Sequence, residues 1–214
     1  MRRKVVLVIL LVIIVGLFLG LGYQQGFLDR AFDTEGRYDP SELTDMGVIY
    51  SNRSDITSFN EGYSESNNCP WGFIHNGVDY FFANDSNVIA AAPGIVETID
   101  LNDWGPEAAH RYTINVGIRF NSTVTVMYAF EPWTNSTLDQ DQQLSMFSFE
   151  VGTWIARGNI IAEFLKSGDG AHIHFGVVQD GVWRDPTQYM STDGYNELLG
   201  LIHDYHPTWE VSYP

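Results

Sequence analysis

Four residues in two short motifs combine side chains that bind transition metals. His75 and Asp79 lie four positions apart in the segment WGFIHNGVD, and His172 and His174 lie two apart in GAHIHFGVV. Side chains alternate along a strand, so the second pair projects from one face. Residues four apart can share a face on a strand or on a helical turn. Imidazole nitrogens and a carboxylate in this arrangement predict a zinc site.

Each histidine taken alone is more simply explained as a satisfied core or surface residue. His172 and His174 together are harder to explain in this way, because two polar rings on one face of an apolar strand are costly without partners. Glycines beside both motifs also allow a close approach of the backbone. These glycines are Gly72, Gly77, Gly170 and Gly176. The combined pattern favours zinc binding.

Several segments resemble motifs of the lysostaphin-type zinc metallopeptidases, also called LytM-domain peptidoglycan endopeptidases. The first is HNGVDYFFANDSNVIAAAPGIVETID, and AHIHFGV is similar to the closing His-x-His motif of the family. VGTWIARGNIIAEF resembles the Val-x-x-Gly-x-x-Ile segment that precedes it, and RDPTQYM resembles the Asp-Pro and Tyr near the end of such domains. The resemblance covers residues 69–190, with its motifs in the order of the family.

The resemblance implies that His75, Asp79 and His174 ligate Zn²⁺ and that His172 lies beside the metal as a catalytic base or stabilising group. Three protein ligands leave a fourth position for water, as in catalytic zinc sites. Zinc lowers the pKa of that water and polarises a peptide carbonyl, and a nearby imidazole can move the proton. The implied function is a zinc metallopeptidase that hydrolyses peptide bonds of cell-wall or envelope peptides.

One position departs from the family pattern. The family carries a further histidine in a Tyr-x-His motif, whereas this chain reads VMYAFEPW, with Phe130 in place of the histidine. A phenyl ring neither donates a hydrogen bond to an oxyanion nor carries a proton, and losing one such donor lowers the rate about 100- to 1,000-fold. Two other functions are therefore considered: a catalytically weak or inactive zinc-binding domain for envelope peptides or a partner protein, and a structural domain.

His110 is a candidate to compensate for Phe130. A two-residue turn after Phe120 would place Thr113 opposite Phe130 and His110 opposite Trp133. His110 would then lie about 10 Å further along the hairpin, in a loop-like segment that could fold toward the zinc. The simpler interpretation is a solvated loop histidine.

Short β-segments are expected to position these residues. The expected fold is mainly β, an antiparallel sheet or sandwich as in the LytM-like family, with a short C-terminal helix at 195–204. The chain is divided into a transmembrane anchor (1–23), a stalk partly packed on the domain (24–68), the metallopeptidase-like domain (69–190) and a tail (191–214). Strands are expected at 88–92, 95–101, 112–120, 123–130, 159–164 and 172–178.

The N-terminus has the pattern of an uncleaved signal anchor. Arg2, Arg3 and Lys4 precede an apolar run of eighteen residues at 5–22, close to the length of about 20 residues needed to span a bilayer. No small-residue cleavage pattern follows it. Basic residues stay on the cytoplasmic side, so the sequence predicts a single-pass membrane protein with a cytoplasmic N-terminus and an extracytoplasmic domain.

Charge and modification signals agree with that location. Without the three basic residues of the anchor, eight Lys and Arg face 27 Asp and Glu, a net charge of −19. Nucleic acid is an improbable partner for such a chain. Asn-x-Ser/Thr sequons give mild support for exposure outside the cell. They lie at Asn52, Asn84, Asn121 and Asn135.

Three further residues have competing interpretations. Cys69 is the single cysteine, which excludes an internal disulfide. It is expected to be a small buried hydrophobe, with an intermolecular bridge or a contact near the metal as alternatives. His203 and His206 invite a second metal site, but they lack nearby carboxylate partners in the motif region and are expected to be solvated.

Overall fold

The computed structural model describes residues 42–214. The predicted anchor at 1–23 and the first part of the predicted stalk therefore lie outside the described residues. Among residues 42–214, no helix combines the length and apolar character needed to cross a membrane.

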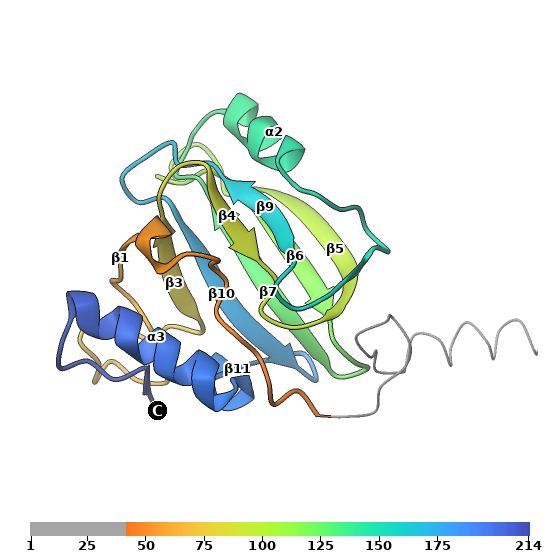
Figure 1. Cartoon of the computed structure of the whole chain (residues 1–214). Coiled ribbons are helices and arrows are strands. Elements are labelled where there is room, and N and C mark those ends of the chain that lie inside the picture. Colours follow the sequence, from red (N-terminus) through yellow and green to blue (C-terminus); the bar gives the residue numbers. More distant parts are fainter. Residues whose placement is uncertain (1–41) are drawn as a thin grey trace, which may run out of the picture.

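Within residues 42–214, a mainly β architecture with two α-helices surrounds one hydrophobic core (Figure 1). The large sheet has eight strands in the order β1-β3-β10-β7-β6-β5-β8, with β11 paired to β10, and every pairing in it is antiparallel. Its strands are β1 (Ile56–Ser58), β3 (Val78–Phe82), β5 (Gly94–Asp103), β6 (Tyr112–Arg119), β7 (Val124–Glu131), β8 (Trp154–Ile155), β10 (His172–Gln179) and β11 (Val182–Arg184). The expectation of a mainly antiparallel β fold is confirmed for this part of the chain.

A second layer covers one face of the large sheet. It consists of β4 (Ser86–Ile89) and β9 (Ile160–Phe164), which pair with each other and lie in front of the sheet in Figure 1. Phe164 of this layer packs on rings of the sheet, 5.8 Å from the Phe82 centroid and 6.5 Å from the Phe130 centroid. Side chains alternate along each strand, so every second residue of the large sheet projects from the face opposite to this layer.

The C-terminal helix predicted at 195–204 is confirmed as α3 (Thr192–Tyr205). The hydroxyl of Ser191 caps it by accepting a hydrogen bond from the Gly194 amide at 3.0 Å. Its apolar residues Leu198, Leu201 and Ile202 are buried at helical spacing.

A second helix, α2 (Thr137–Ser145), was not expected from the sequence. Its buried residues are Gln140 and Gln143, whose amides bond to strand backbone. Gln140 Nε2 donates to the Thr113 carbonyl at 2.9 Å, and Gln143 Nε2 donates to the Glu163 carbonyl at 2.8 Å. A helix attached through polar side chains carries little of the apolar periodicity that sequence reasoning relies on.

The segments on both sides of the predicted domain belong to the same core. Strand β1, within the predicted stalk, pairs with β3 of the large sheet. Further along, β2 (Tyr63–Ser64) pairs in parallel with β12 (Ser212–Tyr213) from the tail. Two short 3₁₀ helices, Arg53–Asp55 and Pro186–Tyr189, complete these segments.

The register of the β6–β7 hairpin differs from the prediction by one residue. Ile114, and not Thr113, lies opposite Phe130. The reason is the turn: Asn121 Oδ1 accepts hydrogen bonds from the amides of Thr123 at 2.9 Å and Val124 at 2.8 Å. This Asx-type arrangement closes a loop of three residues in place of the expected two. A shift of one residue exchanges the faces of paired side chains, which matters for the site below.

Candidate metal centre

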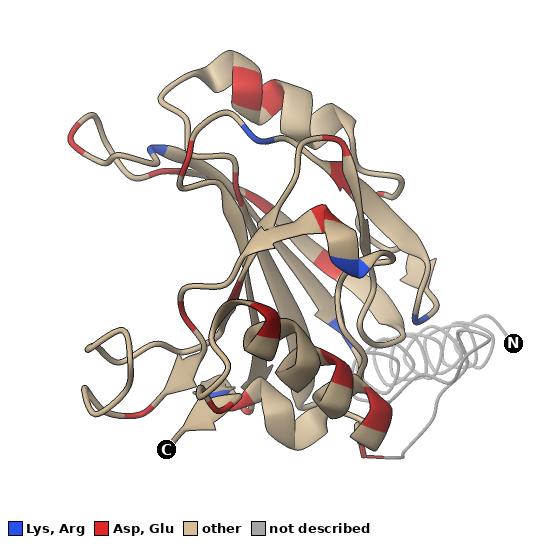
Figure 2. Cartoon of the chain, turned by 60° about the vertical axis from the view of Figure 1, so that its left-hand side comes forward, with Lys and Arg blue, Asp and Glu red and all other residues tan. Residues whose placement is uncertain are grey.

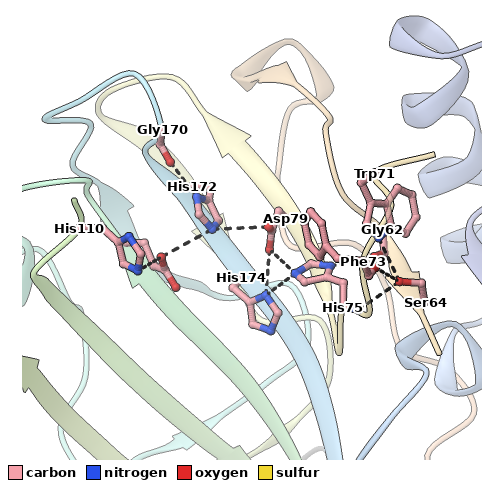
Figure 3. A network of polar contacts seen from close by, with 11 residues as sticks. Gly62, Ser64, Trp71, Phe73, His75, Asp79, His110, Gly170, His172 and His174 are labelled. Atoms are coloured by element: carbon pink, nitrogen blue, oxygen red, sulfur yellow. Dashed lines mark hydrogen bonds and ion pairs between the residues drawn. The ribbon is translucent and has the colours of Figure 1, made fainter. Parts of the chain in front are cut away.

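Three predicted ligands converge where β3 meets β10 (Figure 3). Asp79 and His174 are direct cross-strand partners, and His75 comes from the loop before β3. His174 Nδ1 lies 2.8 Å from Asp79 Oδ1 and 3.1 Å from His75 Nε2, while His75 Nε2 lies 3.4 Å from Asp79 Oδ1. Two atoms bound to a tetrahedral zinc are about 3.4 Å apart, so these side chains fit the ion with small shifts.

The orientation of His75 leaves one ring nitrogen for a metal. Its Nδ1 lies 2.8 Å from the Gly62 carbonyl, which can only accept, so the ring donates there and presents Nε2 to the site. The backbone of His75 is fixed by Ser64: the His75 amide donates to the Ser64 carbonyl at 3.0 Å, and the Ser64 amide donates to the His75 carbonyl at 2.8 Å. The contact with Gly62 sets the tautomer of His75, and the contacts with Ser64 set the position of its backbone.

Asp79 is a buried carboxylate whose charge is stabilised locally. Burial opposes ionisation, but hydrogen bonds from His174 and His75 outweigh it and hold the pKa of Asp79 well below its usual range. Asp79 is 4% exposed, so it offers a negative ligand in a nearly dry position. A neighbouring acid, Glu61, has its pKa raised to about 7 by burial and by the hydrogen bond and charge of Asp79.

His172 lies beside the three predicted ligands. Its Nδ1 donates to the Gly170 carbonyl at 2.7 Å, and its Nε2 lies 3.6 Å from Asp79 Oδ2. The ring also packs on Phe81, with centroids 5.1 Å apart. With Nδ1 used by the backbone, Nε2 is the nitrogen that can take up or release a proton at the site.

Phe130 does not face the site, contrary to the expectation that it occupies the place of a catalytic histidine. It is fully buried, pairs with Ile173, and packs on Phe147 at 4.8 Å on the core side of the sheet. The neighbouring residue Glu131 pairs with His172 and shares its face. Sequence reasoning missed Glu131 because which residue of β7 faces the site depends on register.

His110 lies at the edge of the same constellation. Its ring stacks on Trp133 at 4.6 Å and 24°, and its Nε2 lies 3.8 Å from Glu131 Oε2. Trp133 in turn lies 6.0 Å from His172, ring to ring. His110 thus lies in a loop with a side chain that is 36% exposed, and its ring nevertheless faces Glu131 and Trp133. The register that suggested its position was wrong.

The other predicted candidates lie elsewhere. His203 Nε2 and His206 Nε2 contact the backbone carbonyls of Trp209 at 3.1 Å and Phe59 at 2.6 Å. Their partners are therefore carbonyls and not a second metal group. Cys69 is half-buried in the loop before His75, where its thiol lies 3.3 Å from the Phe73 carbonyl.

Exposed apolar side chains lie beside the centre. Phe73, Ile74 and Trp183 are 46%, 65% and 38% exposed, and Trp183 lies 5.8 Å from the His174 ring. Exposed aromatic residues beside a polar centre can hold an organic ligand. Figure 2 shows acidic residues spread over strands, loops and α3, with few basic ones.

Comparisons with known proteins found similar solved structures but no matching family or curated protein. The similar solved structures include proteins described as peptidases. They include a zinc-containing peptidase from Vibrio cholerae (17% identity, TM-score 0.45, 73% of this chain and 43% of that one), Csd3 from Helicobacter pylori (23%, 0.44, 76% and 39%) and lysostaphin from Staphylococcus simulans (18%, 0.44, 69% and 55%).

The chain thus spans about two fifths to just over half of the length of these neighbours. Similarity at this level does not transfer activity, substrate or partner.

Proposed function

We propose that this chain is a zinc metallopeptidase in which His75, Asp79 and His174 bind the metal and His172 serves as the catalytic base. The observation that carries the proposal is the convergence of two imidazole nitrogens and one carboxylate oxygen within 3.4 Å of one another, with a third imidazole beside them. Three protein ligands leave a position open for water or substrate.

The bound ion would supply Lewis acidity, which polarises a peptide carbonyl, and would make its bound water more acidic. The residues of the chain do the rest. Asp79 stays ionised and contributes negative charge. His172, held through Nδ1 by Gly170, presents Nε2 to accept a proton from the attacking water and to return it to the leaving amine.

The substrate class we propose is cell-wall or envelope peptides. Exposed Phe73, Ile74 and Trp183 beside the centre support an extended organic ligand. The acidic balance of 27 Asp and Glu against 11 Lys and Arg argues against nucleic acid. We further propose that the apolar run at 5–22 anchors the chain in a membrane with the domain outside the cytoplasm.

A hydrolysis assay tests this function. The zinc-loaded full-length chain is incubated with a panel of wall cross-link peptides, including polyglycine and D-amino-acid bridges, and with other envelope peptides. We expect cleavage of at least one class, abolished by a chelator and restored by Zn²⁺. Zinc binding without cleavage of any peptide would contradict the catalytic assignment.

A second function has a specific observation in its favour. Position 130 carries no histidine, and within the described residues β7 presents Glu131 to the site. A zinc-binding domain that holds envelope peptides or a partner protein without cutting them would show peptide affinity and full zinc content, but no hydrolysis.

The remaining alternative is a structural domain, in which the histidines only hold the fold together. Zinc removal would then lower stability and would affect neither binding nor cleavage.

A further inference from the structure

Glu131 is the acidic side chain of β7 that lies on the face of His172. It is the last residue of its strand and the direct cross-strand partner of His172, so the two side chains project to the same side. The catalytic assignment above gives Glu131 no role.

Two imidazoles converge on one oxygen of this carboxylate. Glu131 Oε2 lies 3.7 Å from His172 Nε2 and 3.8 Å from His110 Nε2. Figure 3 shows the rings of His110 and His172 turned toward each other. His110 comes from the β5–β6 connection and His172 from β10, so three separate segments build this group.

The environment of Glu131 makes an accidental arrangement costly. Its side chain is 17% exposed, and within residues 42–214 its ion-pair partners are the two histidines. A largely buried carboxylate is unfavourable unless polar groups face it, and here the two imidazole nitrogens do so.

The two rings offer different atoms to the carboxylate. Nδ1 of His172 donates to the Gly170 carbonyl, so in the neutral ring Nε2 carries a lone pair. Nδ1 of His110 is buried and has no hydrogen-bond partner within the described residues. A buried N–H without an acceptor is rare, so the proton of neutral His110 belongs on Nε2, facing Glu131.

Trp133 holds both rings in this arrangement. Its indole stacks on His110, and it fills the space beside Gly170, where an added Cβ would lie 2.4 Å from Cε2 of the indole. The Gly170 carbonyl is the group that orients His172. Trp133 also has a φ of 61°, a left-handed conformation that costs a non-glycine residue energy and that recurs at functional sites.

We propose that Glu131 is a positioning residue, whose carboxylate lies between His110 and His172 and fixes the orientation of the His172 ring. This inference rests on the proposed metallopeptidase function. Asp79 Oδ2 and Glu131 Oε2 lie 3.6 Å and 3.7 Å from His172 Nε2, so Glu131 helps to fix the direction in which the base of the proposed function points. His110 Nε2 faces the same carboxylate oxygen at 3.8 Å, so His110 and His172 together restrict where the Glu131 side chain can lie. Glu131 thereby gives β7 a part in catalysis that Phe130 cannot have.

The test compares Glu131→Gln with Glu163→Gln in the full-length chain. Glu163 is an exposed glutamate on β9, outside the histidine group, and serves as the matched control. We expect Glu131→Gln to retain zinc and KM while kcat falls about 10- to 100-fold, as for loss of a group that orients a catalytic side chain. His110→Ala should also lower kcat, and the double variant should be no slower than Glu131→Gln because the residues act as a unit.

A second readout is independent of activity. Long-range ¹H–¹⁵N spectra of the imidazoles should show the Nε2 signals of His110 and His172 shifted in Glu131→Gln, whereas those of His203 and His206 stay in place. Unchanged kcat, loss of zinc, or unshifted His110 and His172 signals would each overturn the role of Glu131. If the wild-type chain neither binds zinc nor cleaves peptides, the metallopeptidase function fails, and the spectra still decide whether Glu131 couples the two histidines.

Discussion

His75 and His172 are oriented in the same way, each by the carbonyl of a loop glycine. Gly62 accepts from Nδ1 of His75, and Gly170 accepts from Nδ1 of His172. Both rings therefore present Nε2, but to different neighbours: His75 points at His174 and Asp79, and His172 lies between Asp79 and Glu131. Identical local bonding thus gives one ring a ligand position and the other a proton-transfer position.

Restoring a histidine at position 130 is expected to fail. Phe130 is fully buried against Phe147 and Phe164, on the face away from His172. Phe130→His would bury a polar ring without a partner and lower the free energy of unfolding by about 1–3 kcal/mol. Chemical denaturation measures this loss, with Ile160→His at a half-exposed position as the control. A gain in hydrolysis with unchanged stability would show that position 130 reaches the site.

The sequence identified residues of the site more completely than it identified their neighbours. His75, Asp79, His172 and His174 stand in short motifs whose residue types indicate metal chemistry, so residue type and spacing were enough to predict them. Glu61 and Glu131 carry no such signal. Their positions follow from strand pairing and from a stalk segment that folds onto the domain, neither of which composition records.

At the scale of elements, a single turn decided which residue of β7 faces the site. The side chain of Asn121 closes a three-residue loop, which moved the pairing by one position from the register expected for a two-residue turn. The strands themselves were predictable because their apolar residues alternate, as in β7, where buried and half-buried residues follow one another. Helix α2 was not, because glutamine amides and not an apolar stripe attach it.

The close packing of the loop before β3 on β10 predicts a strong effect at Gly77. A Cβ added there would lie 2.6 Å from His174 Nε2 and 2.6 Å from the Phe175 carbonyl, and the backbone oxygen cannot move freely. Gly77→Ala should displace the His174 ring, reduce zinc affinity at least 10-fold and destabilise the fold by about 1–3 kcal/mol.

Gly47→Ala provides the control, since the nearest atom to its added Cβ is 3.8 Å away. Zinc titration of both variants measures the difference. Equal zinc affinity for Gly77→Ala and Gly47→Ala would contradict the packing that the structure places around His174.

At the scale of the whole molecule, segments from both ends of the described chain support the centre. Trp71, in the loop that carries His75, packs on Trp209 at 5.6 Å and on Tyr213 at 5.2 Å. Strand β12 pairs with β2, where Tyr213 lies opposite Ser64, whose backbone holds His75. The resemblance seen in the sequence ends at residue 190, yet the tail beyond it contributes to positioning the first predicted ligand.

Membrane topology is the prediction that belongs to the full chain. If residues 5–22 form an anchor with the basic end in the cytoplasm, protease added outside intact cells should digest the chain beyond Gln24 and leave a short membrane-embedded fragment. Immunoblotting with tags at both termini measures this. A soluble mature protein that begins near Tyr23 would show instead that the segment is cleaved.

Metal stoichiometry tests the central assignment most directly. Purified wild-type chain should carry close to one zinc, measured by mass spectrometry of the metal, because three side chains converge on one point. His75→Ala, Asp79→Ala and His174→Ala should each lose most of it, whereas His172→Ala should keep it, since His172 is assigned to proton transfer. Equal zinc loss in all four variants would make His172 a fourth ligand, close the site to water and contradict the proposed catalytic centre.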